Sequence, residues 1–188
     1  MEKIKVGFLA GSVRKGSYSR AVAKALIGFL PNGFEAELVD IAELSMYNQD
    51  YDDEGRTPAG WEEFRAKIHS MDAFIFITPE YNRSVPPLLK NAIDIASRPY
   101  GSNAWGGKPA AVVSVSTGPI GGFGANHHLR QVAAVLNMYT MQQPEAYLGG
   151  LGEQMDENGV VTSEGLNEFL QKFAGSFARW TGRFTGTK

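Results

Sequence analysis

The chain has 188 residues, of which 43% are hydrophobic and 20% charged, a composition typical of one soluble globular domain. Its formal net charge of −2 gives no support for a nucleic-acid partner. Because the chain has no cysteine, disulfides, iron–sulfur clusters and a cysteine nucleophile are excluded. The N-terminal apolar run is too short for a signal peptide, and no apolar stretch is long enough to span a bilayer. We therefore expect a single domain over residues 1–188, located in the cytoplasm, with no membrane partner.

Apolar runs alternate with helical patterns along the chain. The first half predicts a strand at Ile4–Ala10, a helix at Ser19–Leu30, a strand at Glu35–Ile41, a polar loop at Asp50–Glu54 and a helix from Pro58 to Met71. The second half predicts a strand at Ala73–Thr78, a helix capped by Ser84 and ending near Ser97, a strand at Ala110–Ser116, a helix at Asn126–Met138, a fifth strand within Thr140–Leu148 and a last helix carrying Leu166 to Trp180. Five strands alternating with helices predict a doubly wound, three-layer α/β/α domain with a parallel sheet in the order 2-1-3-4-5.

The segment Gly11–Arg20 joins the first strand to the first helix and is rich in glycine, serine and arginine. Glycines let the backbone approach an anion, and a helix N-terminus offers unpaired N–H groups. Serine hydroxyls and arginine guanidinium groups add further donors. The segment therefore predicts a phosphate-binding loop, with an ordinary surface turn of the same composition as the alternative.

Two further segments are expected beside this loop, because ligands of such sheets lie outside the carboxyl ends of the strands. They are Pro79–Ser84 and Ser116–Gly124. Three adjacent strands set these loops across roughly 10 Å, which suits a phosphate joined to a flat ring. Gly16 is followed by Ser17 rather than by Lys-Ser/Thr, and the G-x-G-x-x-G spacing is absent, so a mononucleotide is favoured over a nucleoside triphosphate or a dinucleotide.

Two motifs at these positions resemble those of the NADPH-dependent FMN reductase family. Gly11-Ser12-x-Arg14-x-x-Ser17 is similar to the family's phosphate loop, and the stretch from Thr78 to Asp94 resembles its central signature almost position for position. The blocks His128–Arg130 and Gln143–Glu145 resemble later family blocks, so the resemblance runs from about Lys3 to Leu148. The segment after Gly149 is not diagnostic.

The resemblance implies a flavodoxin-like fold and a bound FMN, reduced by NADPH or NADH as co-substrate. It implies contacts to the FMN phosphate from Ser12, Arg14, Ser17, Ser19 and Arg20. It implies that Pro79, Glu80, Tyr81 and Asn82 border the isoalloxazine ring, with Ser116 and Gly118 near its pyrimidine end. Family members form homodimers and often homotetramers, so the helix from Ser84 and the helix containing Arg130 are expected contact faces.

The expected activity is that of an FMN-dependent NAD(P)H oxidoreductase, or quinone reductase, which passes a hydride through flavin N5 to a quinone, free flavin or other small acceptor. No side chain is expected to act as a catalytic acid or base. The alternatives are a flavodoxin-type electron carrier, which the near-neutral charge argues against, and an interaction protein with a vacant site. Arg83 and Arg98 are candidates for reading the 2′-phosphate of NADPH.

Histidines and carboxylates elsewhere do not predict a metal site. His127 and His128 are adjacent on a helix and point to different faces. The acidic residues of Asp50–Glu54 lack the glycine and ligand spacing of a calcium loop, so a solvated loop is expected.

Overall fold

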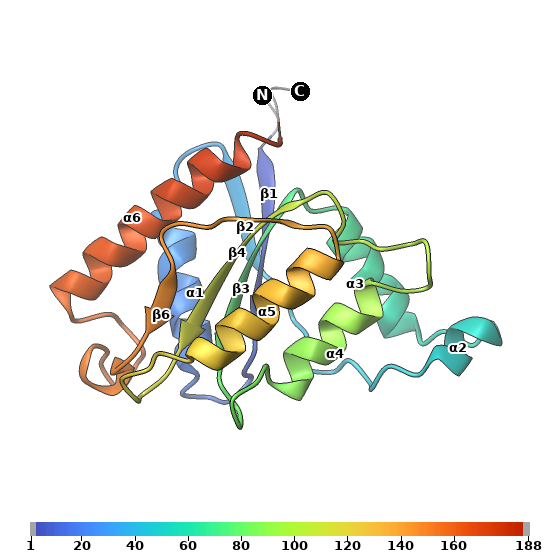
Figure 1. Ribbon diagram of the computed structural model, residues 1–188, viewed down its shortest axis with the longest axis horizontal. Helices are drawn as coiled ribbons and strands as arrows, with labels where there is room; N and C mark the ends of the chain where they lie inside the picture. Colours follow the sequence, from blue (N-terminus) through green and yellow to red (C-terminus); the bar gives the residue numbers. More distant parts are fainter. Residues whose placement is uncertain (1–2, 186–188) are drawn as a thin grey trace.

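The computed structural model describes residues 3–185, so the ends of the predicted domain at residues 1–2 and 186–188 lie outside the described part (Figure 1). The strands are β1 (Ile4–Ala10), β2 (Phe34–Leu38), β3 (Ala73–Pro79), β4 (Pro109–Val115), β5 (Tyr139–Thr140) and β6 (Ala146–Leu148). The helices are α1 (Tyr18–Phe29), α2 (Gln49–Asp53), α3 (Ala59–His69), α4 (Pro87–Ala96), α5 (Phe123–Val135) and α6 (Glu164–Thr181), with a 3₁₀ turn at Leu151–Glu153.

The sheet is parallel and runs in the order β2-β1-β3-β4-β5, with β6 also paired to β4. This confirms the predicted strand order and doubly wound fold. Residues 73–77 of β3 pair with residues 6–10 of β1, and residues 74–79 pair with residues 110–115 of β4. These three strands are almost entirely buried, as expected for strands covered on both faces.

Helices cover both faces of the sheet (Figure 1). On one face α1 and α6 pack over the strands, and their buried side chains include Leu26, Phe173 and Phe177. On the other face α3, α4 and α5 build a second core around Trp61 and Trp105. The aromatic spacing in the last predicted helix is therefore a core pattern, because Phe173 and Phe177 are fully buried against the sheet.

One prediction for the first half of the chain was wrong in detail. The predicted polar loop at Asp50–Glu54 contains the short helix α2, which Asn48 caps by accepting a hydrogen bond from the N–H of Asp50. The carboxylate of Asp52 accepts two hydrogen bonds from Arg65, at 2.8 and 2.7 Å, and these lower the pKa of Asp52. The segment is thus ordered by an ion pair that the local sequence pattern does not show.

The second half differs at two places. Helix α4 begins after Pro86, which has extended backbone and makes no side-chain cap, so Ser84 is not its N-cap. The fifth strand is divided into β5 and β6, which pair with different parts of β4, because residues 141–145 leave the sheet between them. None of the described helices is long and apolar enough to cross a bilayer.

Lys108 lies at the amino edge of the sheet, opposite the strand ends where the three loops emerge. Its ammonium group donates to the carbonyl oxygens of Ile68 and His69 at the end of α3, at 2.7 and 3.2 Å, and lies 5.5 Å from the ring centroid of Phe74. Burial lowers the pKa of Lys108 from 10.5 to about 8, against the opposing charge of Asp72. The lysine therefore joins α3 to the sheet but is poorly solvated when charged.

This shift predicts a pH-dependent stability. Because folding lowers the pKa, the unfolded chain binds more protons between pH 8 and 10.5, and the free energy of unfolding rises with pH across that window. In Lys108→Met the free energy of unfolding should lack this rise. The carbonyl oxygens of Ile68 and His69 at the end of α3 also lose the ammonium group that donates to them. Urea unfolding of both proteins near neutral pH and again near the top of the window measures the difference. A stability gap that stays constant with pH would contradict the assignment.

Candidate functional site

The loops that follow β1, β3 and β4 meet at the carboxyl edge of the sheet and enclose a cleft of about 270 Å³. Its walls come from residues of all three loops: Ser12, Arg14, Ser17, Tyr18, Ser19, Pro79, Glu80, Tyr81, Val115, Ser116 and Thr117. Eight of the predicted site residues are therefore brought together. Arg20, Asn82 and Gly118 do not line this cleft, whereas Tyr18, Val115 and Thr117 do and were not predicted.

The phosphate loop is held in shape by its own serines. Ser17 is the N-cap of α1 and accepts a hydrogen bond from the N–H of Arg20 at 3.3 Å. Its hydroxyl donates to the carbonyl oxygen of Ser12 at 3.1 Å and lies 2.9 Å from the hydroxyl of Ser19. Because the Ser17 proton is used by Ser12, Ser19 is the donor in the second contact. Both hydroxyl protons thus stabilise the loop.

The donors left for an anion are of three kinds. The first-turn N–H groups of Tyr18 and Ser19 have no acceptor within the helix. Arg14 is exposed, and its guanidinium donates to the carbonyl oxygen of Gly16 at 2.9 Å, so it lies across the loop with further N–H groups available. Ser12 faces the same cleft. One cation, helix N–H groups and a hydroxyl match the chemistry of a phosphate monoester.

The wall opposite the phosphate loop is fixed to α5 through Glu80. The Glu80 carboxylate accepts a hydrogen bond from the N–H of Ala125 at 3.1 Å, in the first turn of α5, and pairs with Arg83 at 3.3 Å. A carboxylate at a helix N-terminus is favourably placed relative to the helix dipole. A Cβ atom at Gly124 would lie 2.9 Å from this carboxylate and 2.8 Å from the Arg83 carbonyl oxygen, so glycine permits the close approach.

A tight turn at Tyr81–Ser84 carries the exposed ring of Tyr81 into the cleft wall. The N–H of Tyr81 donates to the carbonyl oxygen of Ser84, and the N–H of Ser84 donates to the carbonyl oxygen of Tyr81, each at 3.0 Å. The two central residues, Asn82 and Arg83, have positive φ angles of 51° and 68°. Asparagine tolerates this conformation better than most residues. The turn therefore accounts for an asparagine at position 82, and a contact between Asn82 and the ring stays a prediction.

The third loop is organised around Ser116 and a glycine pair. The Ser116 hydroxyl faces the cleft and accepts a hydrogen bond from the N–H of Gly118 at 3.0 Å. Gly121 has a φ of +64°, and a Cβ atom there would lie 2.5 Å from the backbone of Tyr147. This close approach requires glycine. Gly118 thus shapes the loop behind Ser116 rather than lining the cleft.

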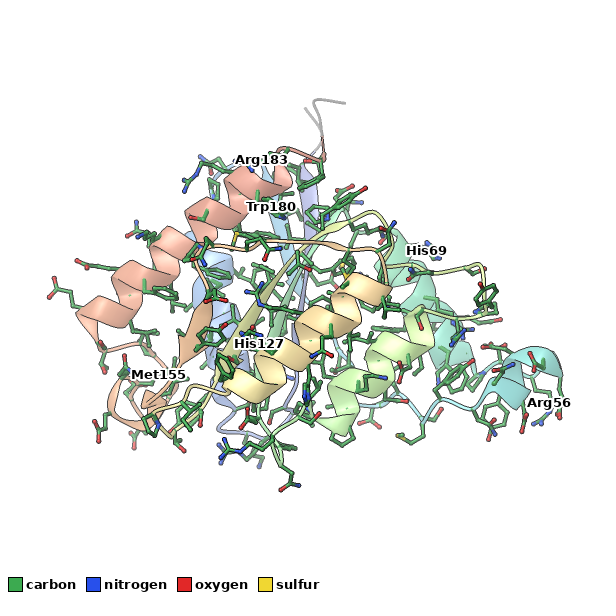
Figure 2. The ribbon with its side chains drawn as sticks, in the orientation of Figure 1. Arg56, His69, His127, Met155, Trp180 and Arg183 are labelled. Atoms are coloured by element: carbon green, nitrogen blue, oxygen red, sulfur yellow. The ribbon has the colours of Figure 1, made fainter. Side chains whose placement is uncertain are left out.

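The two histidines of α5 lie outside this cleft, and both have partners. His128 contacts the Ser84 hydroxyl at 3.0 Å through Nδ1. His127, labelled in Figure 2, contacts the phenol of Tyr147 at 3.0 Å, and that phenol donates to Glu145 at 2.8 Å. Burial and this carboxylate raise the pKa of Tyr147. Their separate contacts agree with the prediction that the two histidines point to different faces.

Comparison with known proteins identifies the family. The sequence model of the NADPH-dependent FMN reductase family matches residues 4–151. A quinone reductase from Pseudomonas putida is 50% identical over 175 residues, which cover 93% of this chain and 93% of that protein. The structure of a flavoenzyme NAD(P)H:(acceptor) oxidoreductase from Paracoccus denitrificans superposes with a TM-score of 0.88 at 38% identity, covering 96% of this chain and 98% of that one.

The chain belongs to the NADPH-dependent FMN reductase family, as its two motifs predicted. The flavodoxin-like fold is confirmed by a flavodoxin from Pseudomonas aeruginosa, with a TM-score of 0.56 and 22% identity over 93% of this chain and 99% of that one.

Because Asn82 has a positive φ, alanine and glycine substitutions can distinguish a requirement of the backbone from a contact made by the side chain. Asn82→Ala should destabilise the protein by about 1 kcal/mol, since alanine lacks the local hydrogen bonding that makes this conformation tolerable. The loss of stability should be smaller in Asn82→Gly. Thermal unfolding should show a decrease of roughly 2–4 °C in Tm for the alanine variant. A ring-contacting side chain would instead give both variants the same loss of ligand affinity.

Proposed function

We propose that this chain, as one domain over residues 1–188, binds FMN in the three-loop cleft and catalyses electron transfer from NAD(P)H to a quinone or another small acceptor. The observation that carries the proposal is the cleft itself, in which a loop with available hydrogen-bond donors lies opposite a wall formed by Pro79, Glu80 and Tyr81. Family membership and the quinone reductases among its relatives support the same activity. The reaction needs NAD(P)H, so the expected cytoplasmic location stays part of the proposal.

The residues present fit FMN. Arg14, Ser12 and the first-turn N–H groups of α1 would hold the phosphate, and Pro79, Glu80 and Tyr81 would flank the ring. Ser17 and Ser19 would keep the loop in its binding conformation, a role that their hydrogen bonds within the loop support. When bound, FMN supplies hydride transfer at N5. The chain's own part is to orient the ring and to leave one face accessible beside the half-exposed Tyr81.

A flavodoxin-type electron carrier remains the competing function on this fold. A reductase and an electron carrier differ in whether they oxidise NADPH catalytically. Purified holoprotein should show a yellow flavin spectrum that bleaches with NADPH under argon and returns when a benzoquinone is added. Steady-state NADPH oxidation with the quinone should be sustained for a reductase and nearly absent for a carrier.

Arg14→Ala tests the phosphate site. Because a hydrogen bond to a charged group contributes about 1.5–3 kcal/mol, FMN affinity should fall about 10- to 100-fold with the fold intact. Fluorescence titration of the apoprotein with FMN measures the change. Arg56→Ala is the matched control, since Arg56 is exposed beside α2 and pairs with Glu54 far from the cleft. Equal affinity in the two variants would show that Arg14 does not bind the phosphate.

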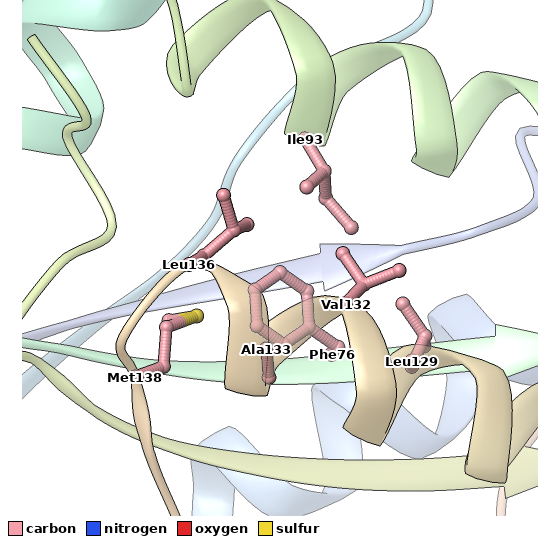
Figure 3. A pocket seen from close by; sticks show the side chains of 7 residues that line it. All are labelled: Phe76, Ile93, Leu129, Val132, Ala133, Leu136 and Met138. Atoms are coloured by element: carbon pink, nitrogen blue, oxygen red, sulfur yellow. The ribbon is translucent and has the colours of Figure 1, made fainter. Parts of the chain in front are cut away.

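A homodimer, with a tetramer as the larger alternative, is proposed through the face formed by α4 and α5. Between these helices, above β3, a closed apolar seam leaves no room for a water molecule; it is formed by Phe76, Ile93, Leu129, Val132, Ala133, Leu136 and Met138 (Figure 3). Beside it Val135 is 82% exposed. Both expected contact helices, from Ser84 and around Arg130, lie on this face. The exposed Val135 beside this seam supports contact with a second copy of the chain.

Val135→Glu tests this face. A carboxylate buried at an apolar interface costs several kcal/mol, so the dimer dissociation constant should rise by at least about tenfold. Sedimentation velocity over a concentration series measures the oligomer. Val160→Glu is the control, because Val160 is 58% exposed in the loop before α6, away from α4 and α5. The proposed face is wrong if both variants associate like the parent chain.

A further inference from the structure

A groove of about 350 Å³ lies beside the end of α6 and has no part in the site described above. One wall is the segment Met141–Gln143, which leaves the sheet between β5 and β6. The other wall is the last part of α6 and the residues after it, which contribute Ser176, Arg179, Trp180 and Arg183. Figure 2 shows Trp180 and Arg183 at this end of the helix. The groove shares no residue with the three-loop cleft.

Trp180 is fixed in the wall of the groove by neighbouring aromatic residues. Its indole N–H donates to the carbonyl oxygen of Tyr139 at 2.8 Å. The ring of Phe184 packs edge-on against the indole, with centroids 5.0 Å apart, and stacks on the ring of Tyr139 at 4.4 Å. Tyr139 pairs with Pro109 at the start of β4, which places this cluster at the amino edge of the sheet. Trp180 therefore offers a rigid aromatic surface remote from the three loops.

The groove is positively charged. From Phe169 to the end of the chain there are four basic residues and no acidic residue, although the formal net charge is −2. Arg179 donates one hydrogen bond to the hydroxyl of Ser176 at 3.0 Å, and the guanidinium of Arg183 lies 5.5 Å from the ring centroid of Trp180. Among residues 3–185, neither arginine takes part in a salt bridge. Because a guanidinium has five N–H donors, both arginines keep donors for an anion.

Two glutamines complete the polar lining. The amide nitrogen of Gln142 donates to the carbonyl oxygen of Thr140 at 3.0 Å, which leaves its amide oxygen as an acceptor. Gln143 is exposed beside it in the same wall. Amide groups supply both donors and acceptors, as the edge of a heteroaromatic ring requires. Cations, an aromatic surface and amides therefore meet in one groove.

We propose that this groove binds a small planar aromatic anion, a ring of nucleobase size that carries a phosphate or a carboxylate group. Arg179 and Arg183 pair with the anionic group, since the guanidinium fork matches both kinds of oxyanion. The ring lies against Trp180 and the guanidinium plane of Arg183, with the glutamines at its edge. The volume of about 350 Å³ is within the range of small-molecule sites.

Tryptophan fluorescence and calorimetry of the FMN-loaded protein test the proposal. Trp61 and Trp105 are fully buried, whereas Trp180 lies in the groove wall, so a saturable change in tryptophan fluorescence reports on the groove. Adenosine 5′-monophosphate represents the phosphates and nicotinate the carboxylates. At least one of them should bind about tenfold or more tightly than its uncharged counterpart, adenosine or nicotinamide. The anion that binds more tightly identifies the group that the groove prefers.

The double variant Arg179→Gln/Arg183→Gln should lose this affinity by about tenfold or more, with an unchanged circular dichroism spectrum. Arg56→Gln is the control, because Arg56 is exposed beside α2 and pairs with Glu54. Trp180→Phe should still bind the anion in the calorimeter without the fluorescence change.

Three results overturn the inference. They are equal binding of the anions and their uncharged counterparts, unchanged affinity in the arginine double variant, and competition of the bound anion with FMN or NAD(P)H, which would place it in the three-loop cleft. A protein that takes up no FMN contradicts the proposed function instead, and the titrations of the groove still decide this inference, because the two sites share no residue.

Discussion

The site depends on the pairing of β1 with β3 in the middle of a buried parallel sheet. The chain leaves β1 toward α1 on one face and leaves β3 toward α4 on the other, so the two loops diverge and open a crevice between them. Backbone hydrogen bonds and buried apolar side chains fix the register of these strands. The register of β1 and β3 therefore sets the separation between the phosphate loop and the Tyr81 turn.

The functional side chains all line the cleft, and several of them also hold its walls in place. Ser17, Ser19 and Glu80 satisfy backbone or neighbouring groups by hydrogen bonds, and their positions in the motifs are explained by loop and helix geometry. Arg14 and Ser12 have donors to spare. The phosphate-loop serines Ser17 and Ser19 therefore also hold the shape of the loop, and their contact with a phosphate stays a prediction.

The sequence predicted the strand order, the two faces of helices and eight of the residues that line the cleft, because apolar periodicity and glycine-rich strand ends report local constraints. Contacts distant in sequence were not predictable in this way. The Asp52–Arg65 pair that orders α2 joins residues on two elements, and the division of β5 from β6 depends on how each pairs with β4. The cleft between α1 and residues 156–159, which Lys15, Arg20 and Lys24 line, was missed for the same reason, since its two walls are distant in sequence.

The hydrogen bond between the Glu80 carboxylate and the N–H of Ala125 joins the wall of the cleft to α5. It ties the turn carrying Tyr81 to the first turn of α5, and the same helix presents Val135 at its other end. The same helix therefore connects the lip of the ring cleft with the surface on which we propose that a second copy of the chain docks.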